Sequence, residues 1–393
     1  MTSASQLVPS RIKSTDPLHE PRDLTAEQRE VFRVRAREAR LAKAAALSGT
    51  AGAALHQVNV PTFDPDALMP QLATNGLTAL SLFSGGGGLD LGFERAGFAH
   101  RGSWEWMAHA AGTLNVARPS WEVHGGPEYG DVRRADWRPY RGQIDVVHGG
   151  PPCQPFSNAG KQRGAADPRD MWPEFVRAVK VVRPKAFVAE NVAALASATF
   201  SEYVEEHILG PLSGTYHIQR VLLQAYEFGV PQVRRRVFFI GFRTKGYARK
   251  WHPPVPKFRH QQDASSDLPP VIGARRALGL PDVGYDGILP TIRSGLSGPR
   301  NTTSILSSVS AQRKFEALQL WPNGVAATRE AASAFAAKNG HFRLAVPDVS
   351  LLQGFPEDWP FQGATYMQLG QIGNSVAPPV AYAVASSVAE ALR

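Results

Sequence analysis

From Leu77 onward, short apolar runs typical of strands alternate with segments whose apolar residues recur at helical spacing. Short apolar runs, rich in β-branched and aromatic residues, end in glycine or polar residues at 77–83, 144–150, 186–192 and 236–242. Between the second and third runs, an apolar stripe at helical spacing extends from Phe175 to Val182, and Arg183-Pro184 predicts its end. Strands that alternate with helices predict an α/β fold with a doubly wound, mostly parallel sheet covered on both faces.

The segments outside this rhythm predict the domain organisation. Residues 1–76 form an N-terminal extension, in which one charged helix after Thr25 precedes a linker that starts at Ser48. The apolar stripe of this helix is thin, which favours a solvated helix over a dedicated DNA contact. Residues 77–244 are the first part of the main domain, and 341–393 complete it with a closing helix that packs back on the sheet. Residues 245–340 are rich in Gly, Pro, Ser and Arg, with one clear helical stretch at 328–338, and predict a smaller, loop-rich domain.

Composition narrows the class of protein. The 393 residues are 43% hydrophobic, which is ample for a core, and contain one cysteine, which excludes a disulfide framework and a thiolate-rich zinc site. We therefore expect no metal. No apolar run has the length of a membrane span, so we expect a cytoplasmic protein without a membrane partner. The formal net charge of +9 weakly indicates a polyanionic partner such as nucleic acid.

A glycine-rich turn is the first candidate site. The stretch LFSGGGGLDLGF follows a predicted strand and opens a predicted helix, where glycines allow close approach of a ligand to the backbone. Glu105 lies 20 residues after Gly85, the interval at which an acid meets a ribose in dinucleotide-type folds, and Trp106 offers a flat wall for an adenine. Asp131 is placed at the end of a third strand. These residues predict an adenosine-containing cofactor, with NAD and S-adenosylmethionine both open.

The single cysteine lies in a second candidate site. Cys153 follows the strand at 144–150 and two prolines, so it is expected at the carboxyl end of a strand, where ligands bind in open α/β sheets. Glu190 ends the next strand and would face the same crevice, where apolar surroundings favour a protonated carboxyl. Arg234 and Arg236 alternate along an extended segment and are expected on one side, with Arg235 on the other.

These pieces together resemble the DNA (cytosine-5)-methyltransferase family of bacterial restriction–modification systems. The matching motifs are LFSGGGGLDLGF, GDV, GGPPCQPFS, ENV, GVPQVRRRVFFIG, LQGFP and GNSVAPPVA, in the family's order from Leu77 onward. The resemblance implies an S-adenosylmethionine-dependent methyltransferase fold, in which 245–340 is the target-recognition domain. It also implies that the cofactor contacts Phe83, Gly85, Gly87, Glu105, Trp106, Asp131, Val132, Pro152, Asn374 and Val376.

The resemblance further implies a mechanism. Cys153 would attack C6 of a cytosine flipped out of double-stranded DNA, while Glu190 holds N3 and the amino edge and C5 takes the methyl group. Arg236 would meet the base oxygen, and Arg234 would support Glu190 or a phosphate. Further DNA contacts are expected from Pro151, Gln154, Ser157, Arg293 and Arg300.

The biological setting follows only from this resemblance. We expect a nucleoid-associated monomer on DNA, with a separately acting restriction endonuclease as a possible partner. The alternatives are an RNA cytosine-5 methyltransferase, a catalytically silent DNA-binding regulator and a NAD-linked oxidoreductase. The motif set argues against the last of these, and the intact cysteine, glutamate and arginines argue against the silent regulator.

One segment departs from the family's usual pattern. In RLAVPDVSLLQGFP, a threonine, an Arg-Glu pair and an arginine are replaced by Ala345, Pro347-Asp348 and Leu351. The family's residues at these positions brace the recognition region, so the departure raises the question of what orients that region here.

Overall fold

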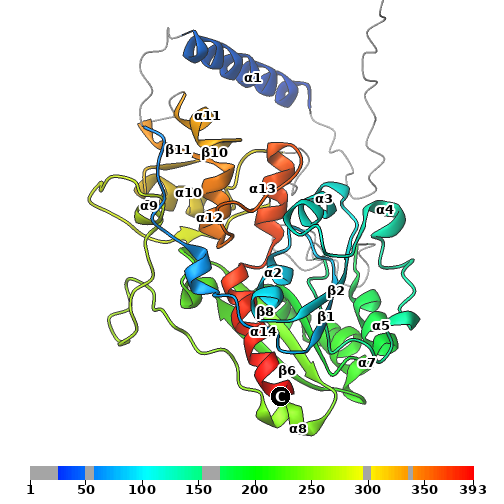
Figure 1. Cartoon of the computed structure of the whole chain (residues 1–393). Coiled ribbons are helices and arrows are strands. Elements are labelled where there is room, and N and C mark those ends of the chain that lie inside the picture. Colours follow the sequence, from blue (N-terminus) through cyan, green and yellow to red (C-terminus); the bar gives the residue numbers. More distant parts are fainter. Residues whose placement is uncertain (1–24, 49–56, 153–168, 295–301, 335–339) are drawn as a thin grey trace, which may run out of the picture.

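A seven-stranded sheet is the centre of the computed structural model, which describes residues 25–48, 57–152, 169–294, 302–334 and 340–393 (Figure 1). Its strand order is β3-β2-β1-β4-β5-β8-β6. The strands are β1 (Thr78–Leu82), β2 (Ala99–Glu105), β3 (Val123–Gly125), β4 (Val146–Gly149), β5 (Ala186–Val192), β6 (His217–Gln224) and β8 (Arg235–Phe242). All neighbouring pairs are parallel except β5–β8 and β6–β8, so the prediction of a mostly parallel sheet is confirmed.

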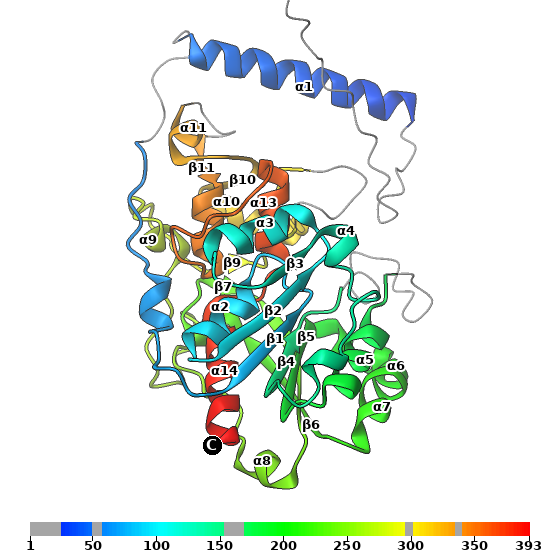
Figure 2. The ribbon, with the colours of Figure 1, turned by 45° about the vertical axis from the view of Figure 1, so that its right-hand side comes forward.

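Helices cover both faces of this sheet (Figure 2). On one face, α2 (Gly88–Arg95) packs closely against α14 (Pro378–Leu392), because a Cβ atom at Gly92 would lie 2.4 Å from the Ala381 Cβ. The other face is covered by α5 (Trp172–Val182), α6 (Ser201–Val204) and α7 (Gly210–Ser213). Arg183 ends α5 in the left-handed conformation. The alternating pattern of the sequence therefore gives the doubly wound arrangement that was expected.

The remaining elements flank the sheet or build the region after residue 244. Two-stranded pairs are formed by β7 (Gln232–Val233) with β9 (Leu289–Pro290), and by β10 (Leu320–Ala326) with β11 (Phe342–Ala345). The other helices are α1 (Ala26–Leu47), α3 (Ala108–Ala117), α4 (Gly126–Tyr129), α8 (Lys245–Lys250), α9 (Ala274–Ala277), α10 (Val309–Ala317), α11 (Arg329–Ser333), α12 (Val346–Gln353) and α13 (Thr365–Asn374). None of the helices in the described ranges is long and apolar enough to cross a membrane.

In the described part of the region after residue 244, α11 lies in the stretch predicted to be helical, whereas α8, α9 and α10 were not predicted. Helix α10 was missed because its nine residues carry only a thin apolar stripe, in which Ala311 and Phe315 are buried. Its start is fixed by Ser308, whose hydroxyl accepts a hydrogen bond from the Ala311 amide at 3.1 Å. Strand β11 pairs with β10 across residue 340, so the small sheet joins the predicted recognition region to the C-terminal part of the chain.

The lead-in before β1 is part of the folded body. The Asn59 side chain donates to the Leu278 carbonyl and to Asp348 Oδ1, both at 3.1 Å, and Met69 is fully buried. The amide of Leu72 donates to the Arg95 carbonyl at 2.9 Å. The segment 57–76 therefore links α2, the region after residue 244 and α12, which the description as a linker did not anticipate.

Candidate active site

The glycine-rich turn lies between β1 and α2, at the carboxyl end of β1. Phe83, Gly85 and Gly87 all have positive φ angles, of 56°, 57° and 87°. For Phe83 this backbone conformation is strained, whereas glycine adopts it freely. Gly88 begins α2 so close to the C-terminal segment that a Cβ atom would lie 2.2 Å from the Val376 carbonyl oxygen. No atom would lie within 4 Å of a Cβ at Gly85, so the turn leaves open space at the sheet edge.

Glu105, the acid expected to meet a ribose, lies against this turn. Glu105 is the last residue of β2, is 4% exposed, and accepts hydrogen bonds from the amides of Gly85 at 2.6 Å and Met107 at 2.7 Å. Burial raises the pKa of Glu105 to about 7, although both amides oppose the shift. The carboxyl group therefore changes charge near neutral pH and lies directly beside the space at Gly85.

A second buried acid lies behind the turn. Asp90, in the first turn of α2, accepts a hydrogen bond from the Ser103 hydroxyl at 3.0 Å. Burial raises the pKa of Asp90 to about 6. Its negative charge adds to the upward shift of the Glu105 pKa. The hydroxyls of Ser81 and Ser84, 2.8 Å apart, make the same region polar.

The other residues predicted to contact the cofactor differ in how exposed they are. Trp106 is half-buried, Val132 and Val376 are buried, and Asn374 is exposed at the end of α13. Asp131 is buried but does not end a strand, which corrects the prediction. Strand β3 ends at Gly125, and the Gly126-Pro127 pair starts helix α4 before Asp131 is reached. The hydrogen bond from Arg133 holds the pKa of Asp131 below its ordinary value.

Sequence reasoning did not identify the residues that hold the turn from behind. The indole Nε1 of Trp359 donates to the Gly86 carbonyl at 2.9 Å, and the Arg118 guanidinium lies 5.2 Å from the indole ring centroid. Arg118 Nε in turn lies 2.7 and 2.8 Å from the two carboxylate oxygens of Glu94. Trp359 follows the LQGFP motif by three residues, which was the only available signal.

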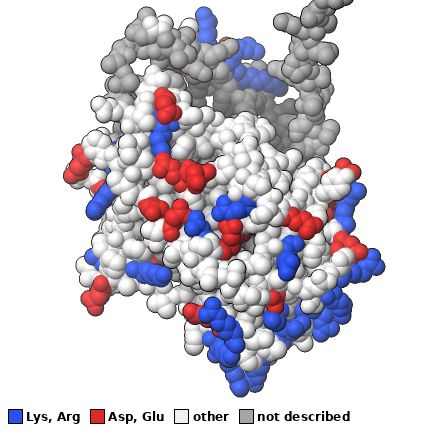
Figure 3. Space-filling view, viewed as in Figure 1, with Lys and Arg blue, Asp and Glu red and all other residues white. Residues whose placement is uncertain are grey.

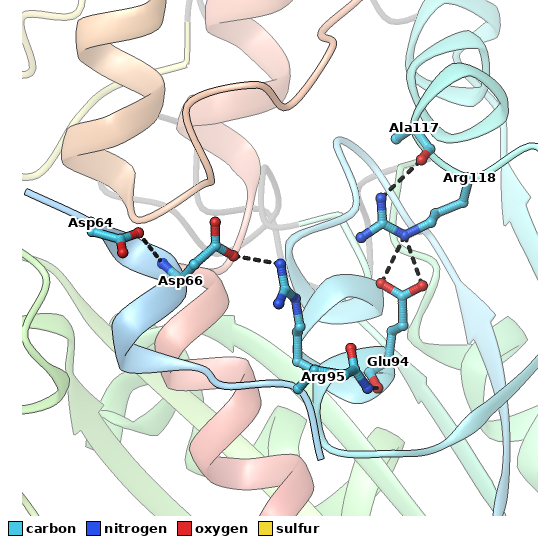
Figure 4. Close-up of polar contacts among 7 residues, drawn as sticks. Asp64, Asp66, Glu94, Arg95, Ala117 and Arg118 are labelled. Carbon is cyan, nitrogen blue, oxygen red and sulfur yellow. Dashed lines mark hydrogen bonds and ion pairs between the residues drawn. The ribbon is translucent and has the colours of Figure 1, made fainter. Parts of the chain in front are cut away.

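Helix α2 is fixed at its C-terminal end by two ion pairs (Figure 4). One is the pair between Arg118 and Glu94, and the other joins Arg95 Nη2 to Asp66 Oδ1 at 2.5 Å. The first pair connects α2 to the end of α3, and the second connects it to the lead-in before β1. Since α2 begins at the glycine turn, these contacts also limit how far the turn can move.

The second candidate site forms where β4 and β5 end side by side. Glu190 is 6% exposed, and a Cβ atom at Gly150 would lie 3.1 Å from its Oε2 atom. The Asn191 side chain donates to the Pro151 carbonyl at 3.0 Å. Parallel pairing of the two strands therefore brings Glu190 to the segment that leads into Cys153.

Glu190 is paired with one of the two predicted arginines. Arg236 Nε lies 2.9 Å from Glu190 Oε1, because Arg236 on β8 is opposite Val192 on β5. Burial raises the pKa of Glu190 above its ordinary value, and the positive charges of Arg236 and Arg234 oppose the shift. A buried carboxyl of this kind can donate as well as accept a hydrogen bond.

Arg234 is bound to the backbone of neighbouring segments, and its positive charge also acts on Glu190. Arg234 is 1% exposed, and its Nη2 atom donates to the carbonyls of Gly373 at 2.8 Å and Ser375 at 2.7 Å. Nη1 lies 3.3 Å from the Ile292 carbonyl. A guanidinium with these donors engaged does not face a phosphate, so that part of the expectation is corrected. The predicted alternation holds, since Arg235 is exposed while Arg234 and Arg236 point inward.

The remaining predicted contacts are only partly described. Pro151 is buried, Pro152 is half-buried, and the half-buried Arg293 donates its backbone amide to the Ile305 carbonyl at 3.1 Å. Cys153, Gln154, Ser157 and Arg300 lie outside the described residues.

The divergent C-terminal segment carries its own brace for the region after residue 244. Asp348 is fully buried, and its Oδ1 atom accepts hydrogen bonds from Arg329 Nε at 2.8 Å and from Asn59. Its Oδ2 atom accepts the Ala345 amide at 2.9 Å. Arg329 also pairs with Glu357. Arg329, at the start of α11, thus supplies a guanidinium to α12 from outside that segment.

The fold and the two sites define a class of protein. A doubly wound sheet with a glycine turn and an acid at adjacent strand ends is typical of enzymes that bind an adenosine-containing cofactor. The family model for C-5 cytosine-specific DNA methylase matches residues 77–390. The chain belongs to this family, and it is a DNA cytosine-5 methyltransferase that acts on DNA.

Curated relatives agree with the family match. The Type II methyltransferase M.NgoMIV of Neisseria gonorrhoeae is 33% identical over 327 residues, which cover 80% of this chain and 98% of the relative. The Type II methyltransferase M1.HphI of Haemophilus parahaemolyticus is 34% identical over 333 residues, covering 79% and 86%.

Solved structures share the fold. A protein described as a DNA modification methyltransferase encoded within an E. coli prophage has a TM-score of 0.54 and 24% identity, over 80% of this chain and 99% of its own. The Dnmt2 methyltransferase of S. pombe has a TM-score of 0.52 and 15% identity, over 81% and 99%. These likenesses confirm the methyltransferase fold.

Proposed function

We propose that this enzyme methylates C5 of a flipped-out cytosine in a specific double-stranded DNA sequence through a covalent bond between Cys153 and C6. The observation that supports it most directly is the buried Glu190, which is paired with Arg236 at the strand end beside Gly150. A ring carbon in cytosine becomes nucleophilic only if the charge that develops during attack at C6 is stabilised. A carboxyl that holds its proton can stabilise it by donating to N3.

The protein groups then have defined tasks. The Cys153 thiolate forms a bond to C6 while the Glu190 carboxyl donates to N3, and C5 becomes the nucleophile. After C5 is methylated, a base removes the C5 proton, the electron pair returns to the ring, and the bond between sulfur and C6 breaks. Arg236 keeps Glu190 oriented and lies within reach of the base oxygen, and the Pro151 carbonyl accepts from the cytosine amino group. Arg234 positions Arg236 by fixing the segment before β8 to the backbone of Gly373 and Ser375.

S-adenosylmethionine, the methyl donor typical of this family, would supply the methyl group and leave as the thioether S-adenosylhomocysteine. The residues at the glycine turn fit an adenosine-containing ligand, because Gly85 leaves open space and the Glu105 carboxylate lies beside it. Glu105 would accept the ribose hydroxyls, and Trp106 would contact the adenine. Phe83, Gly87, Asp131, Val132, Pro152, Asn374 and Val376 complete the proposed cofactor site, and Gln154, Ser157, Arg293 and Arg300 the DNA contacts.

The names of the curated relatives support a bacterial setting. We infer that the enzyme belongs to a restriction–modification system, in which it protects DNA against a separately acting endonuclease. It would act as a monomer on DNA, in the cytoplasm and associated with the nucleoid. Residues 245–340 would read the target sequence as a recognition domain, and residues 77–244 with 341–393 would form the catalytic domain.

Bisulfite sequencing of DNA from cells that express the protein tests the activity and gives the target sequence. A duplex with 5-fluorocytosine at that target should then form a covalent adduct with the wild-type enzyme. Cys153→Ser should lose both methylation and the adduct while it still binds DNA. An adduct that persists in this variant would overturn the role of the cysteine.

Glu190→Gln tests the carboxyl separately. Adduct formation should slow by about two orders of magnitude or more, since a positioned general acid typically contributes about 10²- to 10⁴-fold. The affinity for S-adenosylmethionine should stay unchanged, because Glu190 lies at the β4–β5 crevice. Glu202→Gln, on an exposed position of α6, is the matched control. Equal losses in adduct formation and cofactor affinity would contradict the proposed role.

A further inference from the structure

Basic side chains gather on the edge of the sheet opposite the candidate active site. This is the edge at which β5 and β6 begin and β8 ends, since Ala186 and His217 both pair with Phe242. Glu190 lies four residues along β5 from Ala186, a separation of roughly 13 Å at the usual rise of a strand. Six cations form what we call the basic edge: Arg141, Arg183, Arg243, Lys245, Arg249 and Lys250.

Direct contacts hold these residues in one surface. The Gly142 amide donates to the Val182 carbonyl at 3.1 Å, which brings Arg141 next to Arg183. Arg243 Nη1 donates to the Arg183 carbonyl at 2.6 Å. Helix α8 begins two residues after Arg243, with Thr244 as its cap, and carries the other three cations. The basic edge is therefore a continuous feature of the fold rather than a set of scattered charges.

Few acidic groups lie on the same elements. Asp145 is paired with Lys185, at 2.8 Å, and so is neutralised by a residue outside the basic edge. Glu390 lies near the end of α14, which contacts α8 through the hydrogen bond from Trp251 Nε1 to the Ser387 hydroxyl. Figure 3 shows the resulting concentration of Lys and Arg at the lower edge of the molecule. Within the described chain, no carboxylate forms an ion pair with any of the six cations.

We propose that the basic edge binds the phosphate backbone of a second segment of duplex DNA, separate from the segment whose cytosine enters the active site. Among the described residues no carboxylate pairs with the six cations, and the enzyme works on a polymer that presents phosphates at high local density. Each phosphate contact releases counterions, so several such cations give affinity without reading sequence. This inference goes beyond the proposed catalytic mechanism, because binding at this edge needs neither Cys153 nor Glu190.

DNA binding at the basic edge would keep the enzyme on long DNA. Binding of a neighbouring segment at the basic edge keeps the protein at high effective concentration near further targets. The active-site crevice and the basic edge lie at opposite ends of the strands, so one straight short duplex does not occupy both.

Titration of the wild-type protein with a short fluorescent duplex of unrelated sequence, followed by anisotropy and analytical ultracentrifugation, tests the proposal. We expect two duplexes per protein at low salt, and one for the double variant Arg249→Gln with Lys250→Gln. In the wild-type protein, the affinity of the weaker event should fall with salt, with a slope of about −0.9 per phosphate contact in a plot of log affinity against log salt.

The matched control removes the same charge elsewhere. Arg101→Gln with Arg220→Gln changes two exposed cations outside both the basic edge and the segment 245–340, and should keep both binding events. Unchanged stoichiometry and salt dependence in the α8 variant would overturn the proposal. So would equal losses in both variants, which would indicate a general charge effect. If the α8 variant binds DNA as the wild-type protein does but no longer binds vesicles that contain anionic lipid, the partner of the basic edge is a membrane surface and the proposal of DNA binding is refuted.

The result is separable from that of the catalytic proposal. Methylation of a short duplex that carries one target should be unchanged in the α8 variant. Although α8 opens the segment 245–340, it packs against α14 at the end of the strands away from the active site, and so lies apart from the proposed target-reading surface. An inactive wild-type enzyme would refute the catalytic proposal alone, whereas DNA binding at the basic edge can be measured without activity.

Discussion

Acidification should weaken binding of S-adenosylmethionine through Glu105. The proposed role of this residue requires a carboxylate, which accepts the ribose hydroxyls, and burial raises its pKa to about 7. A ligand that binds only the ionised form loses affinity by the fraction of protein that is protonated. With this pKa, the loss is about tenfold between about pH 8 and about pH 6, or about 1.4 kcal/mol.

Isothermal titration calorimetry in the absence of DNA measures this effect directly. The dissociation constant should rise steeply below about pH 7 and level off above it. Unfolding does not account for such a loss, because an acid whose folded pKa lies above its unfolded value stabilises the folded state as the pH falls toward the unfolded pKa. The free protein therefore becomes more stable over the range in which it loses cofactor affinity.

Glu105→Gln is the control for this prediction. The amide does not ionise, so the variant should bind more weakly above about pH 7 and show a flat profile. An affinity that is constant with pH in the wild-type protein, or that increases on acidification, would refute the argument. A pH dependence that persists unchanged in the variant would assign the titration to another group, such as Asp90.

Four further predictions follow from the contacts around the site. The free energy of unfolding should fall by roughly 3 kcal/mol as the pH rises from about 4.5 to about 7, because Glu105 is protonated in the folded state over this window; urea titrations at several pH values measure it. Trp359→Phe leaves the buried Gly86 carbonyl without its donor, so stability should fall by about 1–3 kcal/mol, and cofactor affinity should fall more than DNA affinity. Gly88→Ala places a Cβ atom 2.2 Å from the Val376 carbonyl and should weaken cofactor binding, whereas Gly214→Ala, with open space around it, should not. Arg329→Met leaves the Asp348 carboxylate buried without its cation, so the free energy of unfolding should fall by about 3–5 kcal/mol, as measured by thermal unfolding, and the KM for DNA should rise. An unchanged free energy of unfolding would show that Asn59 and the Ala345 amide are sufficient partners for Asp348.

Local patterns predicted the main elements well. The strands at β1, β4, β5 and β8 were visible because each is a short apolar run that is buried on both faces. Strand β6 was not identified, since an edge strand with exposed positions such as Leu222 has a mixed pattern. Asp131 was misplaced because a Gly-Pro pair that starts a short helix resembles a strand end in the sequence.

The sequence by itself determined the chemistry of the sites. Motif order places Glu190 and the segment before Cys153 at neighbouring strand ends, and the glycine turn and Glu105 at another pair. The order of the strands is enough to predict these two pairings, because a parallel sheet brings the carboxyl ends of its strands to one edge.

Only the tertiary structure decided which polar groups engage one another over long sequence separations. Arg234 is a backbone anchor because Gly373 and Ser375 pass beside it, and Trp359 reaches Gly86 across 273 positions. Asp348 meets Arg329 and Asn59, which answers how the divergent segment is braced. Side chains of these types can form hydrogen bonds with many different groups. Which group each one contacts therefore depends on how the elements pack and not on the spacing of the residues along the chain.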